Sequence, residues 1–326
     1  MKVNNEFSIA LLLPYFGSLP NYFQLWLDSA KYNGKFDFFI ITDSVMDNFS
    51  IPKNVHIIRM TFLEVKKRVA KVLPYSFKLD EPYKLCDYRP LFGLVFQDVI
   101  MKYKYWGHCD PDIIWGDLSK YITPHVLASY DRIYTSGHLT IYRNNATIND
   151  SALITPKHSL LNSKHVYTSN YSAYFDEGSL LRELQAQVGM RIYESIDCAD
   201  VLYDKKPFVI KLEEKKKGIC FFEYNNGCIY GYNSNEKTEF SYVHLQKRKM
   251  KVFCKNLMHY YIFPNVFVDK GEKEEVQKTC LMDAEQYAKN QRKLLFWRRV
   301  KNIRKGALKF RLLNFISKMY YNGKQN

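Results

Sequence analysis

The sequence lacks any apolar run that could cross a membrane. No stretch of about 18 apolar residues occurs among its 326 residues, so no spanning helix is expected. The opening residues 1–6 lead directly into a strand-like run and do not have the shape of a secretory signal. Both absences favour a protein of the cytoplasm.

Cysteine is scarce, and its pattern excludes a cysteine zinc site. The seven cysteines are scattered and form no C-x-x-C pair, which fits reduced thiols in the cytosol. Internal repeats and low-complexity linkers are missing as well. A chain of this length can bury a full core, so we expect one large domain or a domain with an appendage.

Acidic residues are missing from the C-terminal tail. Residues 286–326 hold twelve Lys or Arg and no Asp or Glu, which leaves 36 basic and 33 acidic side chains in the rest of the chain. Twelve of the fifteen net positive charges therefore belong to the tail, and the body is nearly neutral at +3. A body that binds nucleic acid is expected to carry a basic stripe of its own, so no nucleic-acid partner is predicted.

Short apolar runs alternate with a helix-like segment in the first 60 residues. Three runs have the continuous apolar character of strands buried on both faces, and one segment between them has helical periodicity. This spacing predicts an α/β fold with a doubly wound, Rossmann-like sheet, in which ligands bind outside the carboxyl ends of the strands. The strands are expected at 8–13, 36–43 and 55–60, and the helix at 21–30.

Later segments extend this domain to residue 250. Further strands are predicted at 131–134, 138–142, 208–210, 219–224, 228–232 and 241–245. Asn225-Asn226-Gly227 supplies a hairpin-type turn between two of them. Residues 251–326 are expected to form a helical extension that is basic from residue 286.

Two carboxylates lie one residue apart at the expected end of a buried strand. Asp110 and Asp112, in His108-Cys109-Asp110-Pro111-Asp112, follow the aromatic run 103–106. Hard divalent cations such as Mn²⁺ and Mg²⁺ take oxygen ligands of this kind and bridge them to substrate phosphates. The alternative is a solvated turn that follows a strand.

The surrounding residues resemble a known family. Lys84-x-x-Asp87-x-Arg89-Pro90 followed by 106–117, which contains Asp110-Pro111-Asp112, resembles the D-x-D region of GT-A glycosyltransferases. Residues 1–250 as a whole resemble glycosyltransferases of bacterial capsule and surface-polysaccharide loci. The supporting motifs are Pro14-Tyr15-Phe16-Gly17, Thr42-Asp43, Ser136 to Asn144 and Tyr242 to Arg248.

The resemblance implies a role for each matching residue. The expected metal ligands for Mn²⁺ or Mg²⁺ are Asp110, Asp112 and His244. The expected nucleotide-sugar contacts are Pro14, Tyr15, Asp43, Lys84, Asp87, Arg89, His138 and Lys247. An ion pair at a helix start for Asp87 and Arg89, a core position for Tyr15 and a capped imidazole for His244 are the structural alternatives.

An inverting enzyme of this class needs a carboxylate base. Asp176 and Glu177 are the candidates, although acids are also common at the start of a helix such as the one expected from Ser179. The predicted activity is transfer of a sugar from a nucleotide-sugar donor, with a UDP-sugar expected first, to a glycan or lipid-linked glycan. A non-catalytic binding protein and a nucleotidyltransferase remain alternatives on the same fold.

The tail has the pattern of a basic amphipathic helix. Trp297 adds an interfacial aromatic side chain to this helix. An anionic membrane surface at the inner face of the plasma membrane is the expected partner. Packing of the helix on the body is one alternative, and RNA binding is another. Apolar residues recur at Phe296, Val300, Ile303, Ala307 and Phe310, with Arg298, Lys301, Lys305 and Lys309 on the other side.

Overall fold

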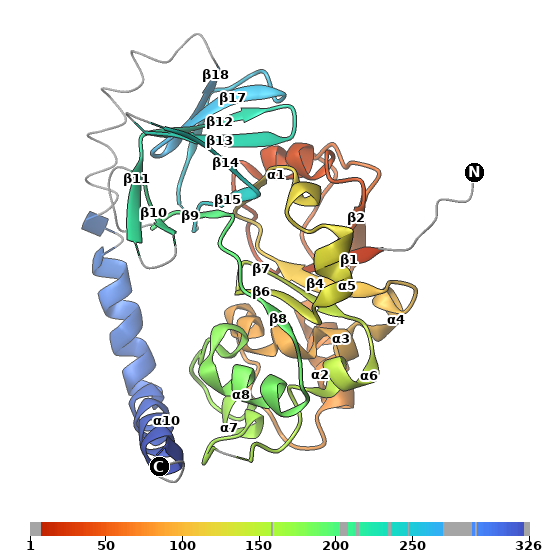
Figure 1. The fold of residues 1–326 in the computed structure, drawn as a ribbon, viewed down its shortest axis with the longest axis vertical. Helices are drawn as coiled ribbons and strands as arrows, with labels where there is room; N and C mark the ends of the chain where they lie inside the picture. Colours follow the sequence, from red (N-terminus) through yellow and green to blue (C-terminus); the bar gives the residue numbers. More distant parts are fainter. Residues whose placement is uncertain are drawn as a thin grey trace.

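The computed structural model shows an α/β protein with C-terminal helices (Figure 1). Its central layer is a seven-stranded mixed sheet, most of whose neighbouring strands run parallel. The other strands form a six-stranded sheet, a three-stranded sheet and a two-stranded pair. The structure describes residues 8–157, 159–202, 208–212, 215–233, 236–246, 248–269, 289–290 and 292–322.

The seven-stranded sheet has the order β3-β2-β1-β4-β7-β6-β8. The first four strands in this order are parallel, whereas β7 pairs antiparallel with both β4 and β6. The chain moves outward from β1 through β2 to β3 and then returns to β4 on the other side of β1. Its strands are β1 (Ile9–Pro14), β2 (Phe36–Thr42), β3 (Val55–Arg59), β4 (Tyr105–Cys109), β6 (Arg132–Ser136), β7 (Leu139–Arg143) and β8 (Ile192–Tyr193).

Both faces of this sheet are covered. Alternate residues of β1 enter two separate apolar clusters, with Leu12 on one face and Leu11 on the other. This double burial explains the continuous apolar run in the sequence, and it confirms the strands predicted near the N-terminus. The helices on the Leu12 face are α2 (Phe62–Val72), α3 (Phe92–Val95) and α8 (Ser179–Gln187), and those on the Leu11 face are α1 (Phe23–Ala30) and α5 (Pro124–Ser129).

Short elements make most of the connections. The segment before β4 is a 3-10 helix with two short α-helices, and residues 144–172 contain two short helices. These elements are η1 (Pro82–Leu91), α4 (Gln97–Ile100), η2 (Leu118–Lys120), α6 (Ala146–Asp150), α7 (Ser163–Tyr167) and η3 (Phe175–Glu177).

The second large sheet is antiparallel except at one edge, and its order is β14-β13-β12-β17-β18-β16. Asn226 and Gly227 both have positive φ in the hairpin between β12 and β13, as the Asn-Gly turn predicts. The strands are β12 (Phe221–Asn225), β13 (Cys228–Tyr232), β14 (Lys237–Phe240), β16 (Lys251–Val252), β17 (His259–Phe263) and β18 (Val266–Asp269).

Residues 251–269 therefore differ from the expectation of a helical extension. They form three strands of the same sheet as β12 to β14, so this sheet continues past residue 250. The helical part lies later in the chain. Residues 292–304 are helical, and α10 (Ala307–Asn322) follows after Gly306, whose φ of 99° suits the change of direction.

Helix α10 packs on the body along one face (Figure 1). Phe310 contacts the ring of Tyr171, Ala307 is buried, and the Ser317 hydroxyl accepts a hydrogen bond from Leu160 N at 3.0 Å. Two residues of the apolar stripe expected to face a membrane thus face the protein instead. No helix among the described residues has the length and apolar character needed to span a bilayer.

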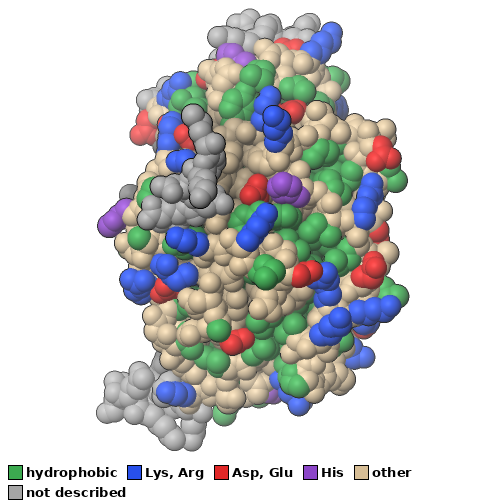
Figure 2. Space-filling view, turned by 90° about the vertical axis from the view of Figure 1, so that its right-hand side faces the viewer, with side chains coloured by type: hydrophobic (Ala, Val, Ile, Leu, Met, Phe, Trp, Pro, Cys, Tyr) green, Lys and Arg blue, Asp and Glu red, His purple; other side chains and the backbone are tan. Residues whose placement is uncertain are grey.

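Charges of both signs are interspersed on the surface of the body. The face in Figure 2 shows Lys and Arg side chains alternating with acidic ones, and a histidine and an acidic side chain lie together near its middle. This agrees with the near-neutral composition of the chain outside the tail.

Candidate metal centre

A small sheet brings distant parts of the chain to the end of β4. Strand β15 (Tyr242–His244) pairs antiparallel with β5 (Ile113–Trp115) and parallel with β9 (Ala199–Asp200). These pairings place His244 opposite Ile113 on one side and opposite Asp200 on the other. Because Asp112 immediately precedes β5, the side chain of His244 comes to lie beside the carboxylate pair.

Asp110, Asp112 and His244 form a group that could hold a metal ion. The Nε2 atom of His244 lies 3.4 Å from Oδ1 of Asp112 and 3.8 Å from Oδ2 of Asp110. Two ligand atoms each about 2.1 Å from a shared octahedral ion are separated by about 3.0 to 4.2 Å. Both distances fall in that range. The group is largely enclosed, since Asp112 is 1% exposed and His244 is 7% exposed.

Asp200 orients the imidazole of His244. Its Oδ1 atom lies 2.8 Å from Nδ1 of His244 and also accepts a hydrogen bond from Gln246 Nε2 at 2.7 Å. A proton on Nδ1 leaves the lone pair of Nε2 directed toward the Asp110/Asp112 pair. A carboxylate behind a histidine in this way is the usual second contact of metal-ligating histidines.

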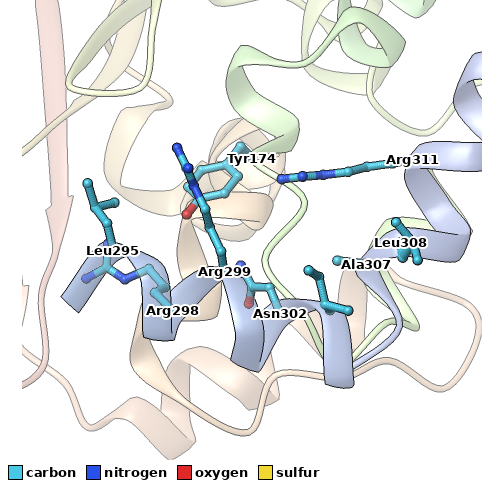
Figure 3. Close-up of a pocket in the computed structure, with 9 residues that line it drawn as sticks. Tyr174, Leu295, Arg298, Arg299, Asn302, Ala307, Leu308 and Arg311 are labelled. Atoms are coloured by element: carbon cyan, nitrogen blue, oxygen red, sulfur yellow. The ribbon is translucent and has the colours of Figure 1, made fainter. Parts of the chain in front are cut away.

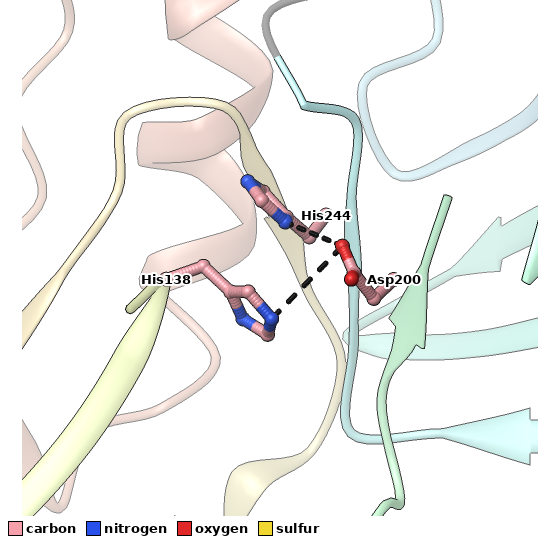
Figure 4. Close-up of side chains that lie close together, drawn as sticks. All are labelled: His138, Asp200 and His244. Atoms are coloured by element: carbon pink, nitrogen blue, oxygen red, sulfur yellow. Dashed lines mark hydrogen bonds and ion pairs between the residues drawn. The ribbon is translucent and has the colours of Figure 1, made fainter. Parts of the chain in front are cut away.

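His138 lies beside His244, with the two ring centroids 4.3 Å apart, and both imidazoles are directed at the same oxygen of Asp200 (Figure 4). Its Nε2 atom is 4.0 Å from Oδ1 of Asp200, and its Nδ1 atom is 2.9 Å from the Tyr242 hydroxyl. His138, Asp200 and His244 form a second group with metal-ligand spacing. Asp200 is already at hydrogen-bonding distance from His244, so we assign this second group a supporting role for the Asp110/Asp112/His244 group.

The electrostatics of the two histidines are opposite. Burial lowers the pKa of His244, but the carboxylates of Asp112 and Asp200 outweigh burial and raise that pKa to about 10. Burial and then the charge of His244 lower the pKa of His138 to about 3. The metal-free site thus carries one imidazolium between two carboxylates beside one neutral imidazole.

Arg89 connects the carboxylate pair to the loop before α8. One of its guanidinium nitrogens donates to Gly137 O at 2.6 Å and to Oδ2 of Asp176 at 2.8 Å, and the other forms an ion pair with Oδ1 of Asp110. Arg89 therefore holds one oxygen of Asp110, while the other oxygen faces His244. The expected catalytic pair is brought beside the metal group by this contact.

The carboxylates of Asp176 and Glu177 both lie close to Gly137. Glu177 is exposed, and its Oε1 atom accepts a hydrogen bond from Gly137 N at 2.6 Å. A Cβ atom at position 137 would lie 2.8 Å from Oδ2 of Asp176 and 2.9 Å from Nη1 of Arg89. Only glycine leaves room for this approach. Burial, partly offset by Arg89, raises the pKa of Asp176 to about 7.

Lys84 and Asp87 form a buried ion pair behind the site. Lys84 Nζ lies 2.6 Å from Oδ2 of Asp87, and Asp87 also accepts hydrogen bonds from the backbone N–H groups of Ala173 and Phe175. With exposures of 4% and 0%, both side chains are enclosed by protein. Their observed contacts hold the loop that carries Asp176, and direct contact with a nucleotide stays a prediction.

The remaining predicted contacts lie at or near strand ends. Tyr15 follows β1, and burial and then the carboxylates of Asp112 and Asp110 raise the pKa of its hydroxyl, which places it near the metal group. Pro14 ends β1 and is half-buried, and Asp43 is exposed directly after β2. Lys247 lies outside the described residues.

Sequence reasoning missed Asp200. It lies in a strand of two residues, and its sequence neighbours Cys198, Ala199 and Val201 give no periodic or motif signal. Only its pairing with His244 shows its role.

Comparison with known proteins gives a family but no activity. A model of a family of unknown function, DUF6625, matches residues 11–271, which include every residue of the candidate metal centre. A search of curated proteins finds no match to this chain. The matched segment covers most of the chain and begins within β1. The chain therefore belongs to the DUF6625 family of unknown function.

Proposed function

We propose that this chain is a metal-dependent glycosyltransferase of the GT-A type, which transfers a sugar from a nucleotide-sugar donor. The observation that carries the proposal is the place of the metal group in the sheet. The strand order reverses between β1 and β4, and ligands of doubly wound sheets bind in the crevice at such a reversal. Asp110 follows β4 directly, and Tyr15 follows β1 beside it.

The chemistry of the ligand set supports a hard divalent cation. Two carboxylates and one imidazole suit Mn²⁺ or Mg²⁺ better than a thiolate-preferring ion. Asp110, Asp112 and His244 would hold the ion, which supplies neutralising charge to a departing nucleoside diphosphate. Arg89 positions Asp110 and adds a fixed positive charge to the same crevice.

The carboxylates near Gly137 supply the proton-transfer function in this proposal. A pKa near 7 makes Asp176 suited to accept a proton from an acceptor hydroxyl, because a general base works best near the operating pH. The ion pair with Arg89 fixes its carboxylate in place. Exposed Glu177 is available to bind a hydroxyl of the acceptor, which we propose to be a glycan or a lipid-linked glycan.

Calorimetric titration of the purified full-length chain tests the proposal. With Mn²⁺ present, we expect at least one of a panel of UDP-, GDP- and CDP-sugars to bind, with UDP-sugars tested first. Asp110→Ala and Asp112→Ala should abolish metal-dependent binding, and Asp43→Ala, at the end of the neighbouring strand, should retain it in part. If none of these nucleotide sugars binds in the presence of Mn²⁺, the proposal is wrong.

Product analysis then identifies the reaction. Release of a free nucleoside diphosphate together with a glycosylated acceptor, or with a free sugar when water is the acceptor, indicates glycosyl transfer. In a parallel assay supplied with a nucleoside triphosphate and a sugar phosphate, release of pyrophosphate indicates nucleotidyl transfer and contradicts the assignment. Binding without turnover toward a range of glycan acceptors indicates a binding protein.

A further inference from the structure

The helical tail and the body enclose a cavity that is separate from the metal centre. Its volume is about 270 Å³, and it lies between the helical residues 292–304, the start of α10 and Tyr174 of the body (Figure 3). Sites for whole drug-sized ligands typically measure about 300 to 1,000 Å³. At about 270 Å³ the cavity lies just below that range, and it has room for a phosphate group.

Three arginines make the cavity positive. Arg298, Arg299 and Arg311 line it, and within the described part of the chain none of them forms an ion pair with a carboxylate. The cations on the neighbouring turns differ, because Lys301 and Lys305 are both paired with Glu81 at 3.9 and 2.6 Å. Guanidinium groups bind phosphate oxygens through paired N–H donors, so this cavity suits a phosphate group.

An exposed apolar row begins at the same cavity. Leu308 lines the cavity and is 61% exposed, and Leu312, Phe315 and Met319 continue from it at spacings of four, three and four residues. Residues at this spacing share one face of a helix. The face that packs on the body carries Phe310, Leu313 and Ser317 instead. A contiguous apolar row of this kind on a surface marks an interaction site.

We propose that the tail binds an anionic phospholipid at a membrane surface, with its phosphate in the arginine cavity and its acyl region along the Leu308–Met319 row. The positive charge of the arginines favours a phosphate group in the cavity. The adjoining apolar row favours a lipid over a free anion, because it can contact acyl chains. Phe296 and Trp297 are also exposed on the preceding helical segment and extend the apolar surface. This inference does not depend on the proposed glycosyl transfer.

A vesicle flotation experiment with the full-length chain tests the cavity against general charge attraction. The vesicles contain phosphatidylcholine with or without phosphatidylglycerol. The cavity variant is Arg299→Gln/Arg311→Gln, and the matched control is Arg304→Gln/Lys309→Gln, which removes the same charge from exposed positions outside the cavity. We expect the chain to float only with anionic vesicles, and the cavity variant to lose about tenfold more affinity than the control.

A further variant tests the apolar row. Leu312→Ser/Phe315→Ser should also release the chain, while the melting temperature stays unchanged because both side chains are exposed. Equal losses for the cavity and control variants would overturn the proposal in favour of unspecific attraction. Release by inorganic phosphate at millimolar concentration, or a lipid-free dimer that the row variant dissociates, would overturn it too.

Discussion

Metal binding to the Asp110/Asp112/His244 group requires that His244 lose a proton. Two carboxylates raise its pKa to about 10, so the ring is charged at neutral pH while the site is empty of cation. An imidazole binds a metal ion only in its neutral form, and binding is therefore coupled to loss of this proton. The affinity of the site for metal therefore depends on pH, and the raised pKa of His244 sets the direction of that dependence.

Metal affinity is expected to increase with pH. Below a pKa of about 10 each unit of rising pH makes the neutral imidazole about ten times more common, so the dissociation constant for Mn²⁺ should fall about tenfold per unit between pH 6 and 8. Calorimetry in two buffers of different ionisation enthalpy should show about one proton released per ion. An affinity independent of pH would contradict His244 as a ligand, and His244→Gln should remove the dependence.

Gly137 is expected to be intolerant of a single methyl group. The Cβ of Gly137→Ala would collide with Asp176 and Arg89, so we expect a loss of about 1–3 kcal/mol in the free energy of unfolding, as for overpacked sites. Gly34→Ala is the matched control, because nothing lies within 4 Å of its added Cβ. Denaturant titration measures the free energy of unfolding of both variants. Equal values would show that the loop moves to accommodate the added methyl group without a cost in stability.

At the scale of elements, the strands of the central sheet were predictable and the site only partly so. Residues 9–14 and 36–42 are buried on both faces, and this produces an apolar run that can be recognised without a structure. Residues 260–263 and 266–268 are short apolar runs as well, but a short apolar run alone does not separate a strand from a helix, and pairing with β12 decides the outcome. Asp110, Asp112 and His244 adjoin strands that the sequence indicated, whereas Asp200 depends on a pairing that left no pattern.

The buried ion pair within η1, whose members also bind the loop before α8, is expected to matter more for stability than an exposed pair. Lys84→Met leaves the carboxylate of Asp87 buried without its cation, and such a loss costs about 3–5 kcal/mol. Lys66→Met removes the exposed pair with Asp80 and should cost at most about 1 kcal/mol. Thermal unfolding of both variants checks the contrast, and similar melting temperatures would contradict it.

At the scale of the whole molecule, one face of helix α10 packs on the body and the opposite face is exposed. Phe310 packs on the body and Leu308 is exposed two residues earlier. Phe310→Ala should loosen α10 and increase its cleavage by trypsin several-fold, because α10 loses an aromatic contact with Tyr171. Leu308→Ala should leave the cleavage rate unchanged while weakening vesicle binding. Faster cleavage of both variants would mean that the two faces are not separate.

The pairing of β5 with β15 has a consequence for how the chain reaches its native state. The two carboxylates and the histidine are separated by the whole segment from β5 to β15, so the metal group is complete only when both ends of that segment have met. Contacts between such distant residues close slowly and form late in folding. A cation should therefore recognise the finished fold and not its intermediates, and by mass action it should raise the melting temperature in proportion to the logarithm of its concentration. In this protein, metal binding would therefore report that β5 and β15 have paired and that the fold is complete.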